Sequence, residues 1–99
     1  MTIKRYGSKE IDQDFGPLTF GSALWAHRKC EEISQKEFAK ILDLSSGALC
    51  DLEKGRRIPS PKRAARIARL IGQPEIVWVE LAIQDSLREA NLNYTVKVA

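Results

Sequence analysis

The side chains best equipped for chemistry lie together in one stretch, Ser45–Arg57, which reads SSGALCDLEKGRR. Small and acidic side chains come first, and the cations Lys54, Arg56 and Arg57 follow. Ammonium and guanidinium groups form charge-assisted hydrogen bonds with anions such as phosphates. The stretch therefore predicts contact with an anionic partner, and a solvated basic loop is the alternative interpretation.

Enzyme chemistry has little support in the sequence. His27 is the only histidine, and it stands beside Arg28. Cys30 and Cys50 do not form a CxxC motif, and no base is paired with Cys50 to activate its thiol. The chain also lacks a glycine-rich phosphate loop and a paired-carboxylate motif. We therefore predict no catalytic residues, no metal site and no cofactor, and we expect two reduced thiols.

Charge is distributed unevenly along the 99 residues. The net charge is only +3 and the pI about 9.0, yet every charged residue from Lys54 to Arg69 is a cation. The segment from Glu75 to Glu89 is mainly acidic. This asymmetry indicates an anionic partner for the basic segment.

The composition, with 43% hydrophobic and 29% charged residues, is that of one ordinary globular domain. No run approaches the roughly 18 apolar residues that span a bilayer. The N-terminal stretch MTIKRYGSKEIDQDFG has no apolar signal core. We therefore expect a cytoplasmic protein with no membrane partner.

Apolar spacing and capping signals predict an all-α fold of five helices, followed by a short C-terminal strand. Residues 1–16 are polar and form an N-terminal arm. The expected helices run from Pro17 to about Glu32, from Ser34 to Leu42, from Ser45 to Gly55, from Ser60 to Gly72, and from Pro74 to Ala90. The sequence YTVKV, Tyr94–Val98, alternates β-branched residues and predicts the strand.

The second and third expected helices are joined by about four residues, as in a helix-turn-helix. If Gln35 is position one of such a motif, the small Ala39 is position five, where the two backbones approach closely. Asp43 is position nine, in the turn, and Leu49 and Leu52 are positions fifteen and eighteen, where they face the core. Ser34, with Glu37 three residues later, fits a capping box at the start of the motif.

This spacing, with SQKEFA before it and LEKG after it, resembles the phage repressor and Cro-type family of helix-turn-helix regulators, the XRE type. The resemblance covers about Leu18 to Ile71 and implies that residues 17–72 form a DNA-binding domain. The chain departs from the family at two glycines, which are replaced by Asp43 in the turn and by Glu32 between the first two helices. A turn tolerates Asp because Asp adopts the left-handed conformation more often than most residues.

The resemblance also implies an ion pair inside the fold between Arg28, late in the first helix, and Glu53 of LEKG. Breaking a buried pair costs about 3–5 kcal/mol because one charge is left uncompensated. A solvated surface pair, worth less than about 1 kcal/mol, is the alternative.

By the same resemblance, the third helix enters the major groove of DNA and reads base edges. Its small outward residues offer few bidentate base contacts, so close fit, water and DNA shape would contribute to discrimination. The amide of Gln35 and the cations after the helix would contact phosphates. The DNA contacts implied are Gln35, Ser45, Ser46, Gly47, Cys50, Asp51, Lys54, Arg56 and Arg57.

The last helix carries more apolar residues than one face of a small core requires. The protein is therefore predicted to form a homodimer through residues 73–99. The dimer would place two reading helices about 34 Å apart on DNA. The predicted interface residues are Val77, Trp78, Leu81, Tyr94 and Val96. The alternative is that Trp78 folds onto the first helix of its own chain.

Two functions from different classes remain open at this point. The first is a sequence-specific regulator that binds operator DNA as a homodimer, acting as a repressor. The second is an antitoxin that binds a toxin protein and also its own operator, with residues 1–16 or Tyr94–Ala99 as the toxin-binding segment.

Overall fold

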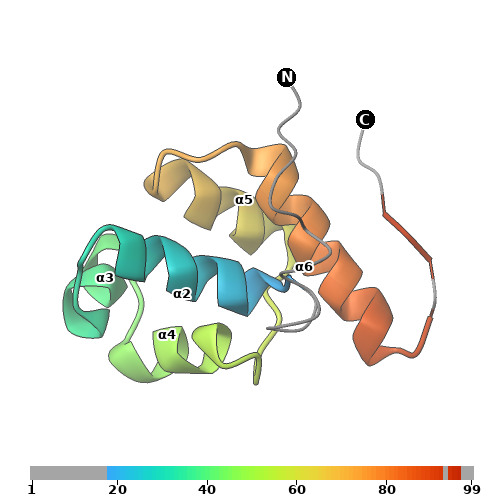
Figure 1. Ribbon diagram of the computed structural model, residues 1–99, viewed down its shortest axis with the longest axis horizontal. Helices are drawn as coiled ribbons and strands as arrows, with labels where there is room; N and C mark the ends of the chain where they lie inside the picture. The colour runs from blue at the N-terminus through green and yellow to red at the C-terminus, as the bar shows by residue number, and fades with distance from the viewer. Residues whose placement is uncertain (1–17, 93, 97–99) are drawn as a thin grey trace.

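The computed structural model describes residues 18–92 and 94–96, so the predicted arm, 1–16, and Pro17 lie outside the described residues. Within the described part, the all-α fold is confirmed (Figure 1). Its helices are α2 (Phe20–Cys30), α3 (Gln35–Ile41), α4 (Ser46–Glu53), α5 (Pro61–Leu70) and α6 (Glu75–Glu89). None of them is long and apolar enough to cross a membrane.

Side-chain caps define where α2, α3, α4 and α5 begin. The hydroxyls of Ser34, Ser45 and Ser60 each accept a hydrogen bond from the backbone N–H three residues later, as predicted from their positions. Helix α2 begins at Phe20, later than predicted, because Thr19 and Ser22 form a reciprocal capping box with both bonds at 3.0 Å.

The two residues that stand where the family has glycines, Asp43 and Glu32, adopt the left-handed conformation. Asp43, in the turn between α3 and α4, has φ 59°, and Glu32, in the turn between α2 and α3, has φ 56°. The α3–α4 turn is closed by the N–H of Leu44, which donates to the carbonyl of Ala39 over 2.8 Å. The predicted short connection between the two helices is therefore present.

The five helices of the described residues contribute to one apolar core. In Figure 1, α2, α3 and α4 lie on one side of the molecule, and α5 and α6 pack against each other on the other. The residues that close the core are buried: Phe20, Leu24, Phe38, Ala39, Leu42, Leu49, Leu52, Ala64, Ile67, Ala68, Trp78 and Ala82.

Trp78 corrects the predicted dimer interface. Its side chain is only 5% exposed and meets the ring of Phe20 edge-on, with the centroids 5.4 Å apart. The imidazole of His27 also lies against it, at 6.5 Å. The ring fills part of the core of its own protomer, so Trp78 is unavailable to a partner chain.

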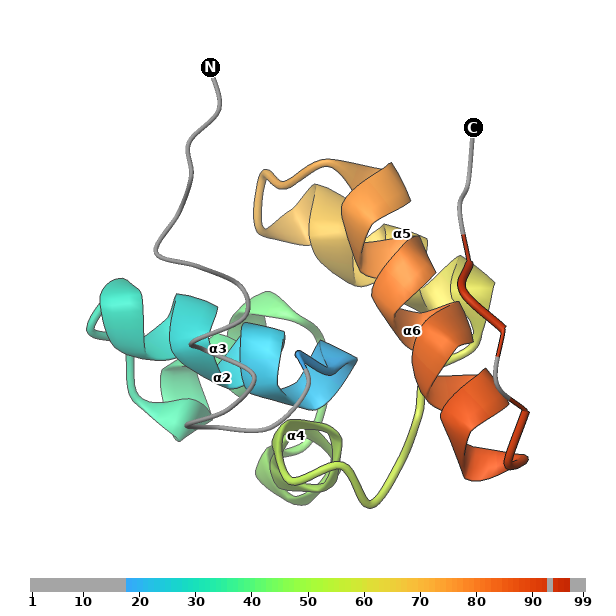
Figure 2. The same cartoon turned by 45° about the vertical axis from the view of Figure 1, so that its right-hand side comes forward.

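The predicted C-terminal strand is absent from the described residues, 94–96 of which are irregular. The side chain of Gln84 on α6 takes the place of a partner strand. Its Nε2 donates to the carbonyl of Tyr94 over 2.7 Å, and its Oε1 accepts from the N–H of Val96 over 2.9 Å. The segment therefore runs back beside α6 (Figure 2).

Candidate nucleic-acid interface

Helix α4 lies at the edge of the molecule, and no described element covers its outer side (Figures 1 and 2). Leu49 and Leu52 face inward and are fully buried or nearly so. Ser46 and Gly47, on the first turn, are exposed, and Cys50 is partly exposed as a free thiol. The helix therefore presents one apolar face to the core and one small, polar face to solvent.

The three cations that follow α4 are exposed. Gly55, with φ 76°, ends the helix in the left-handed conformation, and the chain then turns back. The backbone N–H groups of Arg56 and Arg57 both donate to the carbonyl of Asp51, at 2.9 and 3.3 Å. This turn keeps Lys54 and Arg56 near the outward face of α4, while Arg57 lines a cleft with Gly21 and Asp85.

A second contact fixes the side chain of Arg56. Its Nη1 lies 3.1 Å from Oδ1 of Asp51, and the two side chains are 60% and 36% exposed. The hydrogen bond from Arg56 to Asp51 raises the pKa of the guanidinium above its usual value. The pair places one fixed cation beside a carboxylate on the outward face of α4.

Arg28 and Glu53 form the predicted ion pair, and the pair is buried. Nε of Arg28 donates to Oε2 of Glu53 over 2.7 Å, and Nη2 donates to Oε1 over 3.1 Å. The side chains are 11% and 3% exposed. Nη1 also donates to the carbonyl of Ile33 over 3.2 Å, so one guanidinium joins α2, α4 and the segment before α3.

Gln35 is drawn into the same network. Its Nε2 donates to Oε1 of Glu53 over 3.0 Å, which fixes the amide at the start of α3. Glu53 thus sets the position of a predicted phosphate contact while its own charge is compensated by Arg28. The Gln35 side chain remains partly exposed.

The model of a helix-turn-helix family matches residues 28–78, which include α3, the turn and α4. The chain belongs to the XRE-type helix-turn-helix family. This membership identifies residues 28–78 as a DNA-binding helix-turn-helix region.

One curated relative of this helix-turn-helix protein is the ImmF control region 10 kDa protein of Bacillus phage phi105. The two are 43% identical over 51 residues, which are 52% of this chain. The match spans 57% of the phage protein. No solved structure matches the chain significantly.

The helix-turn-helix brings most of the predicted DNA contacts together. We call the outward side of α4 and the cations after it the α4 surface, defined as Ser45, Ser46, Gly47, Cys50, Asp51, Lys54, Arg56 and Arg57. Gln35 lies beside this surface, where it and Lys54 line one cleft.

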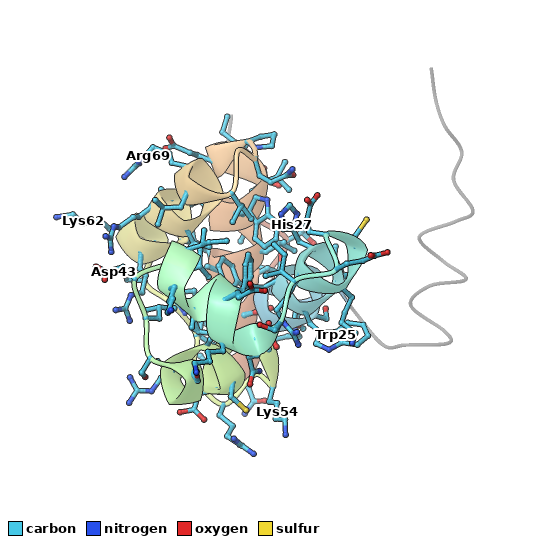
Figure 3. All side chains as sticks on the ribbon, turned by 90° about the vertical axis from the view of Figure 1, so that its left-hand side faces the viewer. Trp25, His27, Asp43, Lys54, Lys62 and Arg69 are labelled. Atoms are coloured by element: carbon cyan, nitrogen blue, oxygen red, sulfur yellow. The ribbon has the colours of Figure 1, made fainter. Side chains whose placement is uncertain are left out.

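The cations of α5 are directed elsewhere. Figure 3 shows Lys62 and Arg69 on the side of the molecule that also carries Asp43, while Lys54 projects from the lower edge. Arg66 lies 3.5 Å from the carboxylate of Asp43, and Arg69 lies 3.4 Å from that of Glu75. Both pairs are exposed, so the basic face of α5 is partly neutralised within the protomer.

Sequence reasoning assigned no role at the site to three further residues, Gly21, Asp85 and Trp25. A Cβ at Gly21 would overlap the carbonyl oxygen of Leu52, so glycine is needed where α2 crosses α4. Asp85 of α6 accepts the N–H of Phe20 over 2.9 Å and so caps α2. Trp25 is 48% exposed and lines the cleft with Gln35. Of the three, only Trp25 could have been found from sequence, because it lies three residues before Arg28 and therefore on the same side of the helix.

Proposed function

We propose that the protein is a repressor that binds operator DNA as a homodimer, with α4 of each protomer in the major groove. The observation that carries the proposal is the α4 surface itself, a small polar helix face that no described element covers and that three exposed cations flank. An α-helix fits the major groove, where each base pair presents a distinct edge.

The residues on the outward face suit a close approach to base edges. Gly47 has no packing role, because a Cβ built there would meet nothing within 4 Å. The absence of a side chain at an exposed helical position therefore supports a close fit to DNA. The hydroxyl of Ser46 can donate to or accept from several bases, whereas a carboxylate such as that of Asp51 accepts from cytosine.

The phosphate contacts fall to Gln35, Lys54, Arg56 and Arg57. Each cation that neutralises a phosphate releases counterions and makes binding more sensitive to salt. Arg57 is the cleaner probe of this role, because the Arg56 guanidinium is bonded to Asp51. Replacing Asp51 would remove a candidate base contact and also release Arg56.

A dimer is supported by apolar side chains left exposed on α6 and on the segment after it. Ile76 and Val77, in its first turn, are 50% and 49% exposed, and Tyr94 is 66% exposed. Leu81 packs partly on the core. The proposed dimer surface therefore lies around Ile76 and Val77. A two-fold dimer would present two reading helices to successive turns of the major groove.

The name of the phage relative, a control region protein, supports a regulatory role for this chain. The antitoxin alternative predicts a different partner, a toxin protein, and would be favoured by copurification of an untagged second protein. The name of the phage relative favours the regulator, so the repressor is the function proposed.

The test is selection of bound duplexes from a random pool by the wild type, Ser46→Ala and Arg57→Ala. We expect Ser46→Ala to change the preferred base at one position of each half-site. Arg57→Ala should weaken binding to every duplex and lower the slope of log affinity against log salt by about 0.9 per protomer. Failure of the wild type to bind any duplex at low salt would contradict the proposal.

A further inference from the structure

A cleft of about 380 Å³ opens beside the α4 surface. It lies between α2, the start of α3 and the end of α4, and its lining residues are Ser22, Trp25, Arg28, Gln35, Glu53 and Lys54. Gln35 and Lys54 are both proposed phosphate contacts. The cleft therefore extends the proposed DNA-binding surface toward α2.

The floor of the cleft does not repel anions, because its one carboxylate is fully bonded. Oε2 of Glu53 accepts from Arg28, and Oε1 accepts from both Arg28 and Gln35. The Arg28–Glu53 pair contributes no net charge, whereas the ammonium of Lys54 is exposed at the rim. The cleft therefore carries a net positive charge that favours an anionic group.

Trp25 forms one wall of the cleft, and the fold does not account for its exposure. The side chain is 48% exposed and takes no part in the core. Nζ of Lys29 lies 5.8 Å from the centroid of the indole, which brings a second cation to this wall. Figure 3 shows Trp25 and Lys54 projecting from the lower part of the molecule, away from α5. An indole offers a flat apolar body and one N–H donor.

We propose that the cleft seats a phosphodiester group of the DNA backbone and that Trp25 is a further DNA contact. The indole covers the adjoining deoxyribose, and its Nε1–H donates to a phosphate oxygen, while Lys54 and Lys29 compensate the phosphate charge. This inference rests on the proposed function, because the backbone reaches the cleft when α4 occupies the groove. Such a contact positions the protein on the duplex and reads no sequence.

Affinity measurements on a selected duplex separate Trp25 from its charged neighbours. We expect Trp25→Ala to weaken binding about tenfold on every duplex, which corresponds to one lost hydrogen bond to a charged group. The salt slope should stay unchanged because Trp25 carries no charge, whereas Lys54→Gln should lower it by about 0.9 per protomer. Leu70→Ala, a truncation of an exposed apolar residue outside the cleft, is the control and should bind as wild type does.

Tryptophan fluorescence reports on occupancy of the cleft directly. Acrylamide reaches the exposed Trp25 but not Trp78, which is 5% exposed. Duplex DNA should therefore protect the wild type from quenching. The Trp25→Phe variant, which retains only Trp78, should show weak quenching with or without DNA. Inorganic phosphate at matched ionic strength should leave Trp25 accessible, because a free anion lacks the deoxyribose that covers the indole.

The outcomes separate this inference from the proposed function. If the wild type binds duplex while acrylamide still quenches Trp25 fully, the cleft is not a backbone site and the inference is overturned. Equal protection by inorganic phosphate would assign the cleft to a free anion and would overturn it too. If the wild type binds no duplex at low salt, the proposed function fails and the inference fails with it.

Discussion

Glu53 and Arg28 form a two-bond ion pair beneath the α4 surface, with Nε–Oε2 and Nη2–Oε1 distances of 2.7 and 3.1 Å. The pair joins the end of α2 to the end of α4 and has almost no access to solvent. Because Glu53 also accepts from Gln35, one carboxylate holds the proposed reading helix and a proposed phosphate contact in a fixed relation.

Loss of the Glu53 charge should destabilise the whole domain. Glu53→Gln keeps the shape of the side chain but leaves the buried Arg28 guanidinium uncompensated. We expect the free energy of unfolding to fall by about 3 kcal/mol, measured by urea denaturation followed by circular dichroism. Asp51→Asn, which breaks the exposed pair with Arg56, is the matched control and should cost less than about 1 kcal/mol. Equal losses in the two variants would show that burial of the pair has no energetic consequence.

The helix crossing at Gly21 gives a second prediction for stability. A methyl group there would overlap the backbone carbonyl of Leu52, which a rotamer change cannot relieve. Gly21→Ala should therefore lower the free energy of unfolding by about 3 kcal/mol, because α2 and α4 must move apart. Thermal and urea denaturation would measure the loss. A variant as stable as the wild type would contradict the close approach of the two helices.

The same substitution at Gly47 should have the opposite effect on stability. Alanine there meets open space and is the better helix former, so Gly47→Ala should stabilise the fold by about 0.5 kcal/mol. DNA binding should nonetheless weaken, because the added methyl group would keep α4 from its close approach to the bases. Titration of a selected duplex with both proteins tests this, and unchanged affinity with raised stability would count against close approach at Gly47.

Substitutions at two neighbouring residues of α6 should have different effects, one on dimer formation and the other on the stability of the fold. Val77→Asp places a charge on an exposed side chain and should give a folded monomer with the protomer mass of 11.2 kDa, against twice that mass for the wild type. Analytical ultracentrifugation would measure both. Trp78→Ala should instead lower the free energy of unfolding by about 3–5 kcal/mol, because it leaves a cavity in the core. A wild type that sediments as a monomer would contradict the dimer.

Much of the fold could be predicted from sequence because its signals are local. A serine caps each of α3, α4 and α5 by accepting the backbone N–H three residues later. Asp43 adopts the left-handed conformation expected of it in the turn. The position of α4 follows from the turn at Asp43, the cap at Ser45 and the inward spacing of Leu49 and Leu52. The Arg28–Glu53 pair, which is not local, was predicted only through the family resemblance.

The remaining features depend on residues far apart in the chain. Asp85 bonds the N–H of Phe20 across 65 positions, and no local pattern indicates that an α6 carboxylate caps α2. Trp78 stands on a helix with apolar residues on several sides, so periodicity alone could not decide whether it faces the core or a partner. Tyr94 and its neighbours have strand-forming residues, but Gln84 satisfies their backbone where a second strand would be required.

The central claim, that α4 enters the major groove, is tested most directly by methylation interference on a selected duplex. N7 of guanine lies in the major groove and N3 of adenine in the minor groove, so the two methylated bases separate the grooves. We predict that methylation of guanine N7 within each half-site abolishes binding and that methylation of adenine N3 at neighbouring positions does not. Interference confined to adenine N3 would contradict the account.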